Sequence, residues 1–267
     1  MIRTARLRAR RVWQTTRFAN PARVLFDLAA SRTPLRREEL QFELRDGARI
    51  VTPNFPGARV PVYEIFVEDA YHLPQLTKGL RHDAAVLDVG GHIGCFSVAV
   101  ARTLPGATVN TYEASPVTAD YAKRNVAGNG LADRVTVNHC AMADHIGTLE
   151  FADNGRGSGL NGITAPSGST VTSVPCVTFD EAVARAGGRV DLVKMDTEGA
   201  EFDIILASSP ESWESVQRVV LEYHPVDGHH VSELEKFFEA AGLHVVHRVG
   251  REEIGGLWLS RDGQAWA

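Results

Sequence analysis

Cysteine is scarce in this chain of 267 residues, which contains only three. Cys95, Cys140 and Cys176 are odd in number, lie far apart and occur within apolar segments. A disulfide framework or a cysteine-rich metal site needs paired or closely spaced cysteines. We therefore expect three buried thiols that pack as small apolar side chains.

Basic residues are not in excess: 28 Lys and Arg stand against 33 Asp and Glu, which gives a net charge of −5. Proteins that bind nucleic acid through their overall charge carry the opposite balance, so no nucleic-acid partner is expected. The start of the chain is a local exception. Among its first 34 residues Asp27 is the only acid, and arginines lie at positions 3, 6, 8, 10, 11, 17, 23 and 32. We interpret this segment as a solvated arm that could also touch an anionic surface or a partner.

Long apolar runs are absent too. No segment approaches the roughly 18 apolar residues of a membrane span. The stretch RVLFDLAA at residues 23–30 is too short for the core of a secretory signal and contains Asp27. The sequence therefore predicts a soluble, cytoplasmic protein without stable membrane insertion.

Hydrophobic residues make up 44% of the chain, enough for one large core with an appendage. From residue 84 onward, short apolar runs rich in β-branched residues alternate with helical segments, which is typical of an α/β fold with a mainly parallel sheet. Parallel strands are predicted at residues 85–89, 108–113, 134–140, 189–196 and 218–224, and antiparallel pairs at 145–153 with 170–179 and 243–249 with 257–260. Helices are predicted at residues 94–104, 116–129, 180–186, 196–206 and 231–242.

The first part of the chain has a weaker pattern. We predict that residues 1–80 form a basic arm and a small cap subdomain, which packs over the ligand edge of the sheet. Residues 81–267 then form the main domain with helices on both faces of the sheet.

The first predicted strand runs into a glycine-rich turn, VLDVGGHIGCFS at residues 86–97. Its spacing is D-x-G-x-x-x-G, from Asp88 through Gly90 to Gly94, and not the G-x-G-x-x-G of a dinucleotide fold. Such glycines allow a tight turn and close approach of backbone to a ligand. Asp88 would repel a pyrophosphate but suits an amine-bearing ligand.

A second acid, Glu113, ends the next strand 25 residues after Asp88. A carboxylate in that place can accept hydrogen bonds from the hydroxyls of a ribose. A nucleoside that also carries an ammonium group describes S-adenosylmethionine. A purely structural turn would explain the glycines alone, but not the acid at the next strand end.

With these motifs the sequence resembles the FkbM-type family of class I S-adenosylmethionine-dependent methyltransferases. The resemblance spans residues 62–259 and rests on LDVGGHIGCFS, TYEASP, VTFDEAV, VKMDTEGAEFDIIL and VLEYHP. It implies a Rossmann-like sheet of seven strands with the last one antiparallel. It also implies methyl transfer, most often to a hydroxyl of a sugar, polyketide or other secondary metabolite.

The resemblance implies a donor site as well. The residues that match the family's cofactor contacts are Asp88, Gly90, Gly94, Glu113, Ala114, Ala141 and Met142. Many class I enzymes place an acid directly after the third strand, whereas this chain has Cys140 there and its next acid at Asp144. Recognition of the adenine ring is therefore the contact that the sequence defines least.

Transfer to a hydroxyl needs a base or a metal, because a hydroxyl is a poor nucleophile until its proton leaves. Asp196, at the end of the predicted strand 189–196, is our first candidate for the base. Lys194 lies two residues earlier on the same side of the strand. It would be a base only with a depressed pKa, and an ion pair with Asp196 is the favoured alternative.

His224 follows the last parallel strand and is a candidate general base near neutral pH. With Asp196 and Glu222 it could instead form a divalent metal site, although the sequence does not require a metal. A hydrogen-bonded surface histidine is the third alternative. Glu198 and Glu201 are expected in the first helical turn after Asp196, where the helix dipole favours acids.

The acceptor is expected to be a small hydroxylated molecule. Tyr63, Glu64 and Tyr71 could contribute to its pocket or simply pack the cap, and the loop at residues 154–162 could be a lid or an ordinary crossover. Polar side chains of that loop available to a substrate are Arg156, Ser158 and Asn161. Homo-oligomerisation remains open.

Three other functions fit parts of the pattern. An N-methyltransferase would share the donor site. A nicotinamide-dependent oxidoreductase would share Glu113, but it needs a glycine where this chain has His92 and has no use for Asp88. A protein that binds S-adenosylmethionine without turnover would share the fold, yet a site without turnover has no chemical reason to hold Asp88, Glu113 and Asp196 together.

Overall fold

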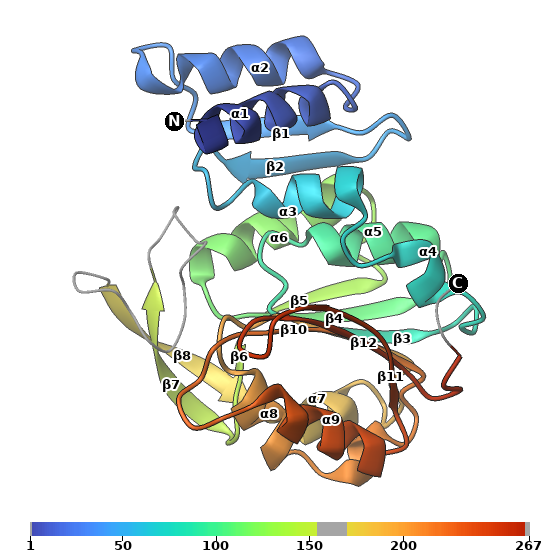
Figure 1. Cartoon of the computed structure of the whole chain (residues 1–267). Coiled ribbons are helices and arrows are strands. Elements are labelled where there is room, and N and C mark those ends of the chain that lie inside the picture. Colours follow the sequence, from blue (N-terminus) through green and yellow to red (C-terminus); the bar gives the residue numbers. More distant parts are fainter. Residues whose placement is uncertain (1, 154–169, 265–267) are drawn as a thin grey trace.

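A sheet of seven strands forms the centre of the molecule in the computed structural model, which describes residues 2–153 and 170–264 (Figure 1). In spatial order the strands are β11 (His244–Gly250), β12 (Gly255–Ser260), β10 (Arg218–Tyr223), β9 (Leu192–Met195), β3 (Ala85–Val89), β4 (Thr108–Glu113) and β5 (Val135–His139). β12 runs antiparallel to both of its neighbours, whereas the five strands from β10 to β5 are parallel. The predicted α/β fold with an antiparallel last strand is confirmed.

Helices cover both faces of this sheet (Figure 1). One face carries α5 (Cys95–Thr103) and α6 (Pro116–Gly128). The other carries α7 (Phe179–Arg185), α8 (Glu201–Ala207) and α9 (Val231–Ala240), with a short 3₁₀ turn, η4, at Pro210–Trp213. Four of these helices lie within two residues of the predicted bounds, whereas α8 begins at Glu201, five residues later than predicted.

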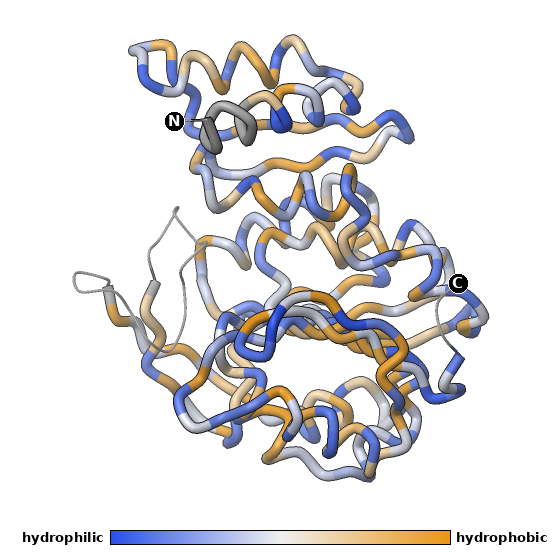
Figure 2. Tube along the Cα trace, in the orientation of Figure 1, coloured by the Kyte–Doolittle hydropathy of each residue, from blue (hydrophilic) through white to orange (hydrophobic). Residues whose placement is uncertain are grey.

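Alternate residues of the strands enter two separate cores. In β3, Val86 belongs to the core under α5 and α6, whereas Leu87 and Val89 belong to the core under the other three helices. Apolar residues accordingly follow the sheet and the inward sides of the helices (Figure 2). Because strand side chains alternate, Asp88 lies on the same side as Val86.

The N-terminal part forms two helices and a hairpin. In chain order they are α1 (Ile2–Thr15), α2 (Pro21–Ala29), the 3₁₀ turn η1 (Ala30–Arg32), β1 (Glu39–Glu43) and β2 (Arg49–Pro53). Asn125 of α6 and Asn129, the residue that follows this helix, hold the hairpin to the main domain. The Asn125 amide accepts from the backbone N–H of Val51 at 2.7 Å and donates to its carbonyl at 3.0 Å, and Asn129 makes the same two bonds to Arg49.

Three short helical pieces connect the hairpin to the sheet: α3 (Val60–Tyr63), the π-helical turn η2 (Glu64–Glu68) and α4 (Leu73–Thr77). Tyr63 packs edge-on against Phe18 and Phe42, with ring centres 5.7 and 5.5 Å away. These rings belong to the same apolar cluster as Val86 of the sheet, so the core is continuous across residue 80.

A second sheet lies beside the first. Its strands are β6 (Ala141–Met142), β8 (Thr170–Val177) and β7 (Gly147–Asp153), in that spatial order. β7 and β8 form the predicted antiparallel pair, and β6 joins β8 in parallel. The three cysteines are buried and free, as expected. Within the described ranges, we find no helix with the length and apolar character of a membrane span.

Candidate active site

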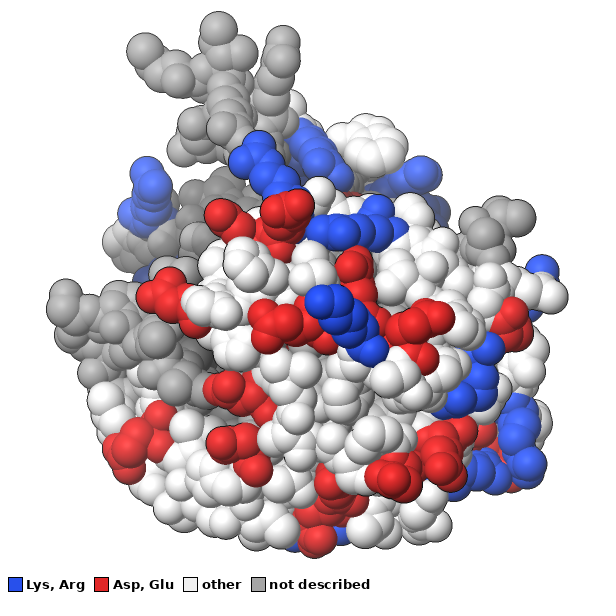
Figure 3. Space-filling view, turned by 60° about the horizontal axis from the view of Figure 1, so that its bottom comes forward, with Lys and Arg blue, Asp and Glu red and all other residues white. Residues whose placement is uncertain are grey.

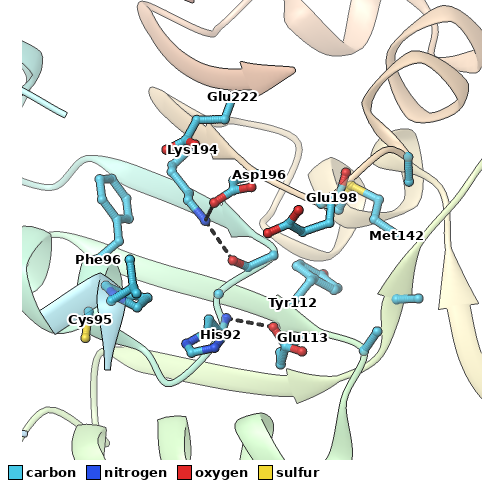
Figure 4. Close-up of a pocket in the computed structure, with 18 of the residues that line it drawn as sticks. His92, Cys95, Phe96, Tyr112, Glu113, Met142, Lys194, Asp196, Glu198 and Glu222 are labelled. Carbon is cyan, nitrogen blue, oxygen red and sulfur yellow. Dashed lines mark hydrogen bonds and ion pairs between the residues drawn. The ribbon is translucent and has the colours of Figure 1, made fainter. Parts of the chain in front are cut away.

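A cavity of about 360 Å³ opens at the carboxyl ends of β3, β4, β9 and β10 (Figure 4). The order of the strands reverses between β3 and β9, and ligands of open α/β sheets bind outside such a reversal. Walls come from the glycine turn, the strand ends, the second sheet and the N-terminal segment. The cavity therefore lies where the sequence places the ligand.

The glycine turn is packed tightly against the neighbouring strand ends. Gly90 has a φ of +73°, and a Cβ there would lie 1.7 Å from the carbonyl oxygen of Asp196. The N–H groups of Gly90 and Gly91 both donate to the carbonyl of Tyr112 at 3.0 Å. Only glycine permits so close an approach to the Asp196 carbonyl. The turn therefore lies directly at the cavity wall.

Gly94 has a different task. Its φ is +79°, and a Cβ would come within 3.2 Å of the Cα of Ala122 in α6. It precedes α5 and does not line the cavity. The structure thus places Gly94 at the contact between two helices and away from the cavity wall, and its predicted role in donor binding stays a prediction.

Asp88 lies beneath the turn, where it is fully buried and does not line the cavity. Its Oδ2 accepts a hydrogen bond from the hydroxyl of Ser97 at 2.5 Å, and its Oδ1 lies 3.5 Å from Nζ of Lys194. The predicted charge-assisted or water-bridged bond from Asp88 to an amine-bearing ligand stays a prediction, and the side chain does not reach the cavity wall. The reason is the pairing of β3 with β9, which sets Asp88 directly opposite Lys194.

Lys194 joins the turn to β9. Its Nζ donates to the carbonyl of Gly90 at 2.7 Å and lies 4.0 Å from Oδ2 of Asp196. Burial acts to lower the pKa of Lys194, but the charges of Asp88 and Asp196 raise it overall. The side chain is therefore a fixed cation, nearer to Asp88 than to the predicted partner, and not a base.

Glu113 is held rigidly at the end of β4. Its Oε2 accepts from the N–H of His92 at 2.7 Å, and its Oε1 accepts from the N–H of Ser115 and the hydroxyl of Thr118, both at 2.8 Å. Burial raises its pKa, and these bonds oppose the shift. A carboxylate has about four acceptor positions, so one remains for a hydroxyl in the cavity.

Apolar side chains form the neighbouring wall. It includes the predicted Ala114, Ala141 and Met142, together with Leu149 and Phe151 of β7. Sequence reasoning missed the last two, although the alternation of apolar and polar residues in β7 was an available signal. This end of the cavity suits a flat apolar ring.

Asp196 stands at the opposite wall, with about 26% of its side chain exposed. The hydroxyl of Tyr71, at 3.5 Å, is its nearest hydrogen-bond donor. Burial raises the pKa of Asp196 to about 7; Lys194 opposes the shift, and Glu222 and Glu198 add to it. A carboxylate of this kind can take up a proton near neutral pH.

His224 is enclosed by two carboxylates. Its Nδ1 lies 3.2 Å from Glu201, and its Nε2 lies 3.4 Å from Glu198. Burial acts to lower the pKa of His224, but Glu201, Asp196 and Glu198 raise it to about 9. The ring is thus protonated at neutral pH and does not line the cavity, so the geometry argues against the expected role as general base.

Glu198 and Glu201 differ in position. The helix α8 begins at Glu201, which is fully buried and accepts from the N–H groups of Thr197 and Gly199 at 2.8 and 3.1 Å. Glu198 does not open the helix as expected. It lies in the preceding loop with a φ of +56° and lines the cavity.

A candidate cation site lies within this cluster. Asp196, Glu201 and His224 each offer a ligand atom, and the three atoms lie within 4.8 Å of one another. The sequence grouped Glu222 with Asp196 and His224, whereas the structure brings in Glu201 and leaves Glu222 at the cavity wall. A metal ion would need a neutral His224, whose two ring nitrogens both face carboxylates.

The N-terminal segment completes the cavity through Glu64, Ile65 and Tyr71. Burial and the charge of Glu222 raise the pKa of Glu64 to about 6. Tyr63 points elsewhere, into the aromatic cluster of the core. The loop 154–162, with Arg156, Ser158 and Asn161, lies outside the described residues, so its role as a lid stays a prediction.

Comparison with known proteins adds the family context. The sequence model of the methyltransferase FkbM domain matches residues 88–245. The 31-O-demethyl-FK506 methyltransferase FkbM of Streptomyces tacrolimicus is 28% identical over 218 residues, which cover 69% of this chain and 82% of that protein. Methyltransferase sdnD of Sordaria araneosa is 26% identical over 198 residues, which cover 60% and 72%.

Among solved structures, the S-adenosylmethionine-dependent methyltransferase from Agrobacterium tumefaciens resembles this chain with a TM-score of 0.50 and 15% sequence identity. The match covers 86% of this chain and 72% of that one. At this identity the likeness concerns the fold alone, which is that of a class I methyltransferase.

Proposed function

This chain belongs to the FkbM methyltransferase family, and we propose that it methylates a hydroxyl oxygen of a sugar, polyketide or other secondary metabolite in the cytoplasm. Membership of the family makes it an S-adenosylmethionine-dependent methyltransferase with a small-molecule acceptor. One relative is named for a 31-O-demethyl substrate, which supports oxygen as the acceptor atom. The observation that carries the proposal is Asp196, a cavity carboxylate whose pKa lies at about 7.

The cavity residues fit the donor. Glu113 retains one acceptor position for a ribose hydroxyl, and the apolar wall with Met142 and Phe151 suits an adenine ring. Gly90 and Gly91 line the cavity with bare backbone because packing against Asp196 and Thr111 leaves no room for a side chain. Asp88 would act from behind the turn, through Lys194. When bound, S-adenosylmethionine supplies an electrophilic methyl group on a sulfonium.

Asp196 would receive the proton. As the acceptor oxygen forms its bond to the methyl carbon, the bond between that carbon and the donor sulfur would break, with S-adenosylhomocysteine as the leaving group. The O–H proton would pass to the carboxylate, and solvent would later remove it. Tyr71 and Phe96 line the same cavity and would exclude water from the acceptor. Lys194 and His224 would remain protonated and position Gly90 and Glu198, without exchanging protons.

The test uses a panel of hydroxylated sugars and polyketides with donor labelled in the methyl group. We expect transfer by the wild type, and a loss of about 10²- to 10⁴-fold in Asp196→Asn with donor binding retained. Donor binding without transfer to any acceptor would point to a non-catalytic binding protein. Tight NAD binding in place of donor binding would refute the proposal altogether.

A second candidate function is N-methylation, because acids dominate the acceptor side. Glu64, Asp196, Glu198 and Glu222 line the cavity, and Lys194 is the only lysine or arginine among its described lining residues. Such a wall would attract an amine-bearing acceptor. Matched acceptors that carry either a hydroxyl or an amine at one position, with the methylated atom identified by NMR, distinguish the two functions.

A further inference from the structure

Charge is divided unequally along this chain. Residues 1–37 contain ten arginines and one acid, whereas the other 230 residues contain 18 Lys and Arg and 32 Asp and Glu. The face that carries the C-terminal helices shows many acidic side chains, and Lys and Arg lie mainly in its upper part and along its right-hand edge (Figure 3). The N-terminal helices thus form a basic region on an acidic protein, and the catalytic proposal does not use it.

Few carboxylates neutralise this region. Among the described residues, four of its arginines share only two carboxylates, Asp27 and Glu68. Arg17 and Arg36 form no ion pair within the described ranges and stack on aromatic rings instead, Arg17 on Trp13 at 5.0 Å. Positive charge therefore remains available at the surface.

The same region exposes apolar side chains. The largest exposed fractions are those of Leu35 at 69%, Phe26 at 59%, Trp13 at 58% and Val12 at 50%. The opposite side of α1 is buried, since Gln14 and Thr15 are 1% and 0% exposed. Exposed aromatic and aliphatic groups between arginines are the composition of helices that lie on lipid surfaces.

We propose that the basic face, defined as the exposed residues Val12, Trp13, Arg17, Phe26, Leu35 and Arg36, binds the surface of an anionic lipid bilayer. Arginines near such a surface are attracted to acidic headgroups, and each contributes roughly a fivefold gain in binding. Tryptophan, phenylalanine and leucine gain by entering the boundary between headgroups and acyl chains. A nucleic acid offers arginines the same attraction but no aliphatic layer for Val12 and Leu35, so lipid is the better match.

Sedimentation with vesicles tests the proposal. The full chain should bind vesicles of equal parts phosphatidylcholine and phosphatidylglycerol, leave pure phosphatidylcholine vesicles unbound, and dissociate in 0.5 M salt, a concentration of about three times the physiological value. The double variant Arg17→Glu/Arg36→Glu should weaken binding roughly 25-fold or more. Trp13→Ala should also weaken binding, but the remaining binding should respond to salt as that of the wild type does, because no charge has been removed.

A matched control lies in the turn between β11 and β12, where Arg251 and Ile254 are also exposed. Arg251→Glu/Ile254→Ala should leave vesicle binding unchanged, and all variants should bind the methyl donor as the wild type does. Absence of binding to anionic vesicles would overturn the proposal, as would equal binding to neutral vesicles or an equal loss in the control. Binding to an acidic protein or to RNA in place of vesicles would overturn it as well.

Discussion

Two carboxylates at the ends of β4 and β9, the strands on either side of β3, are built in opposite ways. Glu113 accepts three hydrogen bonds of 2.7 to 2.8 Å, which fix both of its oxygens. Among the residues that the structure describes, the Asp196 carboxylate has only the Tyr71 hydroxyl at 3.5 Å and Lys194 at 4.0 Å as polar partners. This difference suits Glu113 to holding a ligand and Asp196 to taking up a proton, the two roles that we propose for them.

The difference comes from the surroundings of each group. Backbone N–H groups converge on Glu113 because the turn after β3 and the start of α6 both point their donors toward it. Around Asp196, burial raises the pKa and the acids Glu222 and Glu198 add to this shift, against the opposing charge of Lys194. Substitutions at the two ends should consequently affect different steps.

The largest effect should come from Asp196→Asn, which keeps the shape of the side chain and removes the proton acceptor. We expect turnover to fall about 10²- to 10⁴-fold, with the Kd of the donor within about twofold of wild type by calorimetry. Asp203→Asn, on the exposed side of α8, is the matched control. Unchanged turnover in Asp196→Asn would erase the distinction between the two carboxylates.

Glu113→Gln should act on the other end. The amide loses charge-assisted bonds from His92 and Ser115 as well as a ribose contact, so donor binding should weaken by about 10- to 100-fold. Calorimetry with S-adenosylhomocysteine measures this, and Glu150→Gln on the exposed side of β7 serves as control. A variant that binds the donor normally but turns over slowly would assign Glu113 to catalysis instead.

The pH dependence of kcat/KM should sharpen the comparison further. With a pKa of about 7, Asp196 is protonated and inactive below that pH, so the rate should rise through pH 7 and reach a plateau above it. Glu222→Gln removes a neighbouring negative charge that raises this pKa. Its profile should shift to lower pH by up to about one unit, whereas a shift to higher pH would contradict the arrangement.

The smallest effect is expected at Glu64, which reaches the cavity from the N-terminal segment. Glu64→Gln should change the KM of the acceptor a few-fold and leave the Kd of the donor unchanged, because Glu64 lies on the acid wall. Glu38→Gln, exposed and in the same segment, is a control. An equal change in donor binding would place Glu64 at the donor end.

Sequence patterns predicted the sheet and the position of the site well. β4 and α6 could be predicted because their signals are local in the sequence. These signals are the apolar alternation and Glu113 in β4, and the proline at the start of α6. The role of Gly90 could be predicted for the same reason, because a tight turn with a positive φ favours glycine. The identity of the donor followed from the order of these signals along the chain.

The partners and protonation states of the charged residues could not be predicted from the sequence. Asp88 meets Lys194 because β3 and β9 pair in one particular register, and residues 106 positions apart carry no local mark of that pairing. Against the effect of burial, Glu201, Asp196 and Glu198 raise the pKa of His224, and these acids come from separate parts of the chain. Tyr71 reaches Asp196 from a segment with no periodic pattern. Each case depends on long-range packing.

The central claim is that Asp196 keeps a high affinity for its proton. Site-resolved ¹³C NMR of the aspartate side-chain carboxyls, with Asp196→Asn to assign the signal, measures this directly. The account predicts a titration midpoint near 7 for Asp196. A midpoint near 4, the ordinary value for an aspartate, would contradict it.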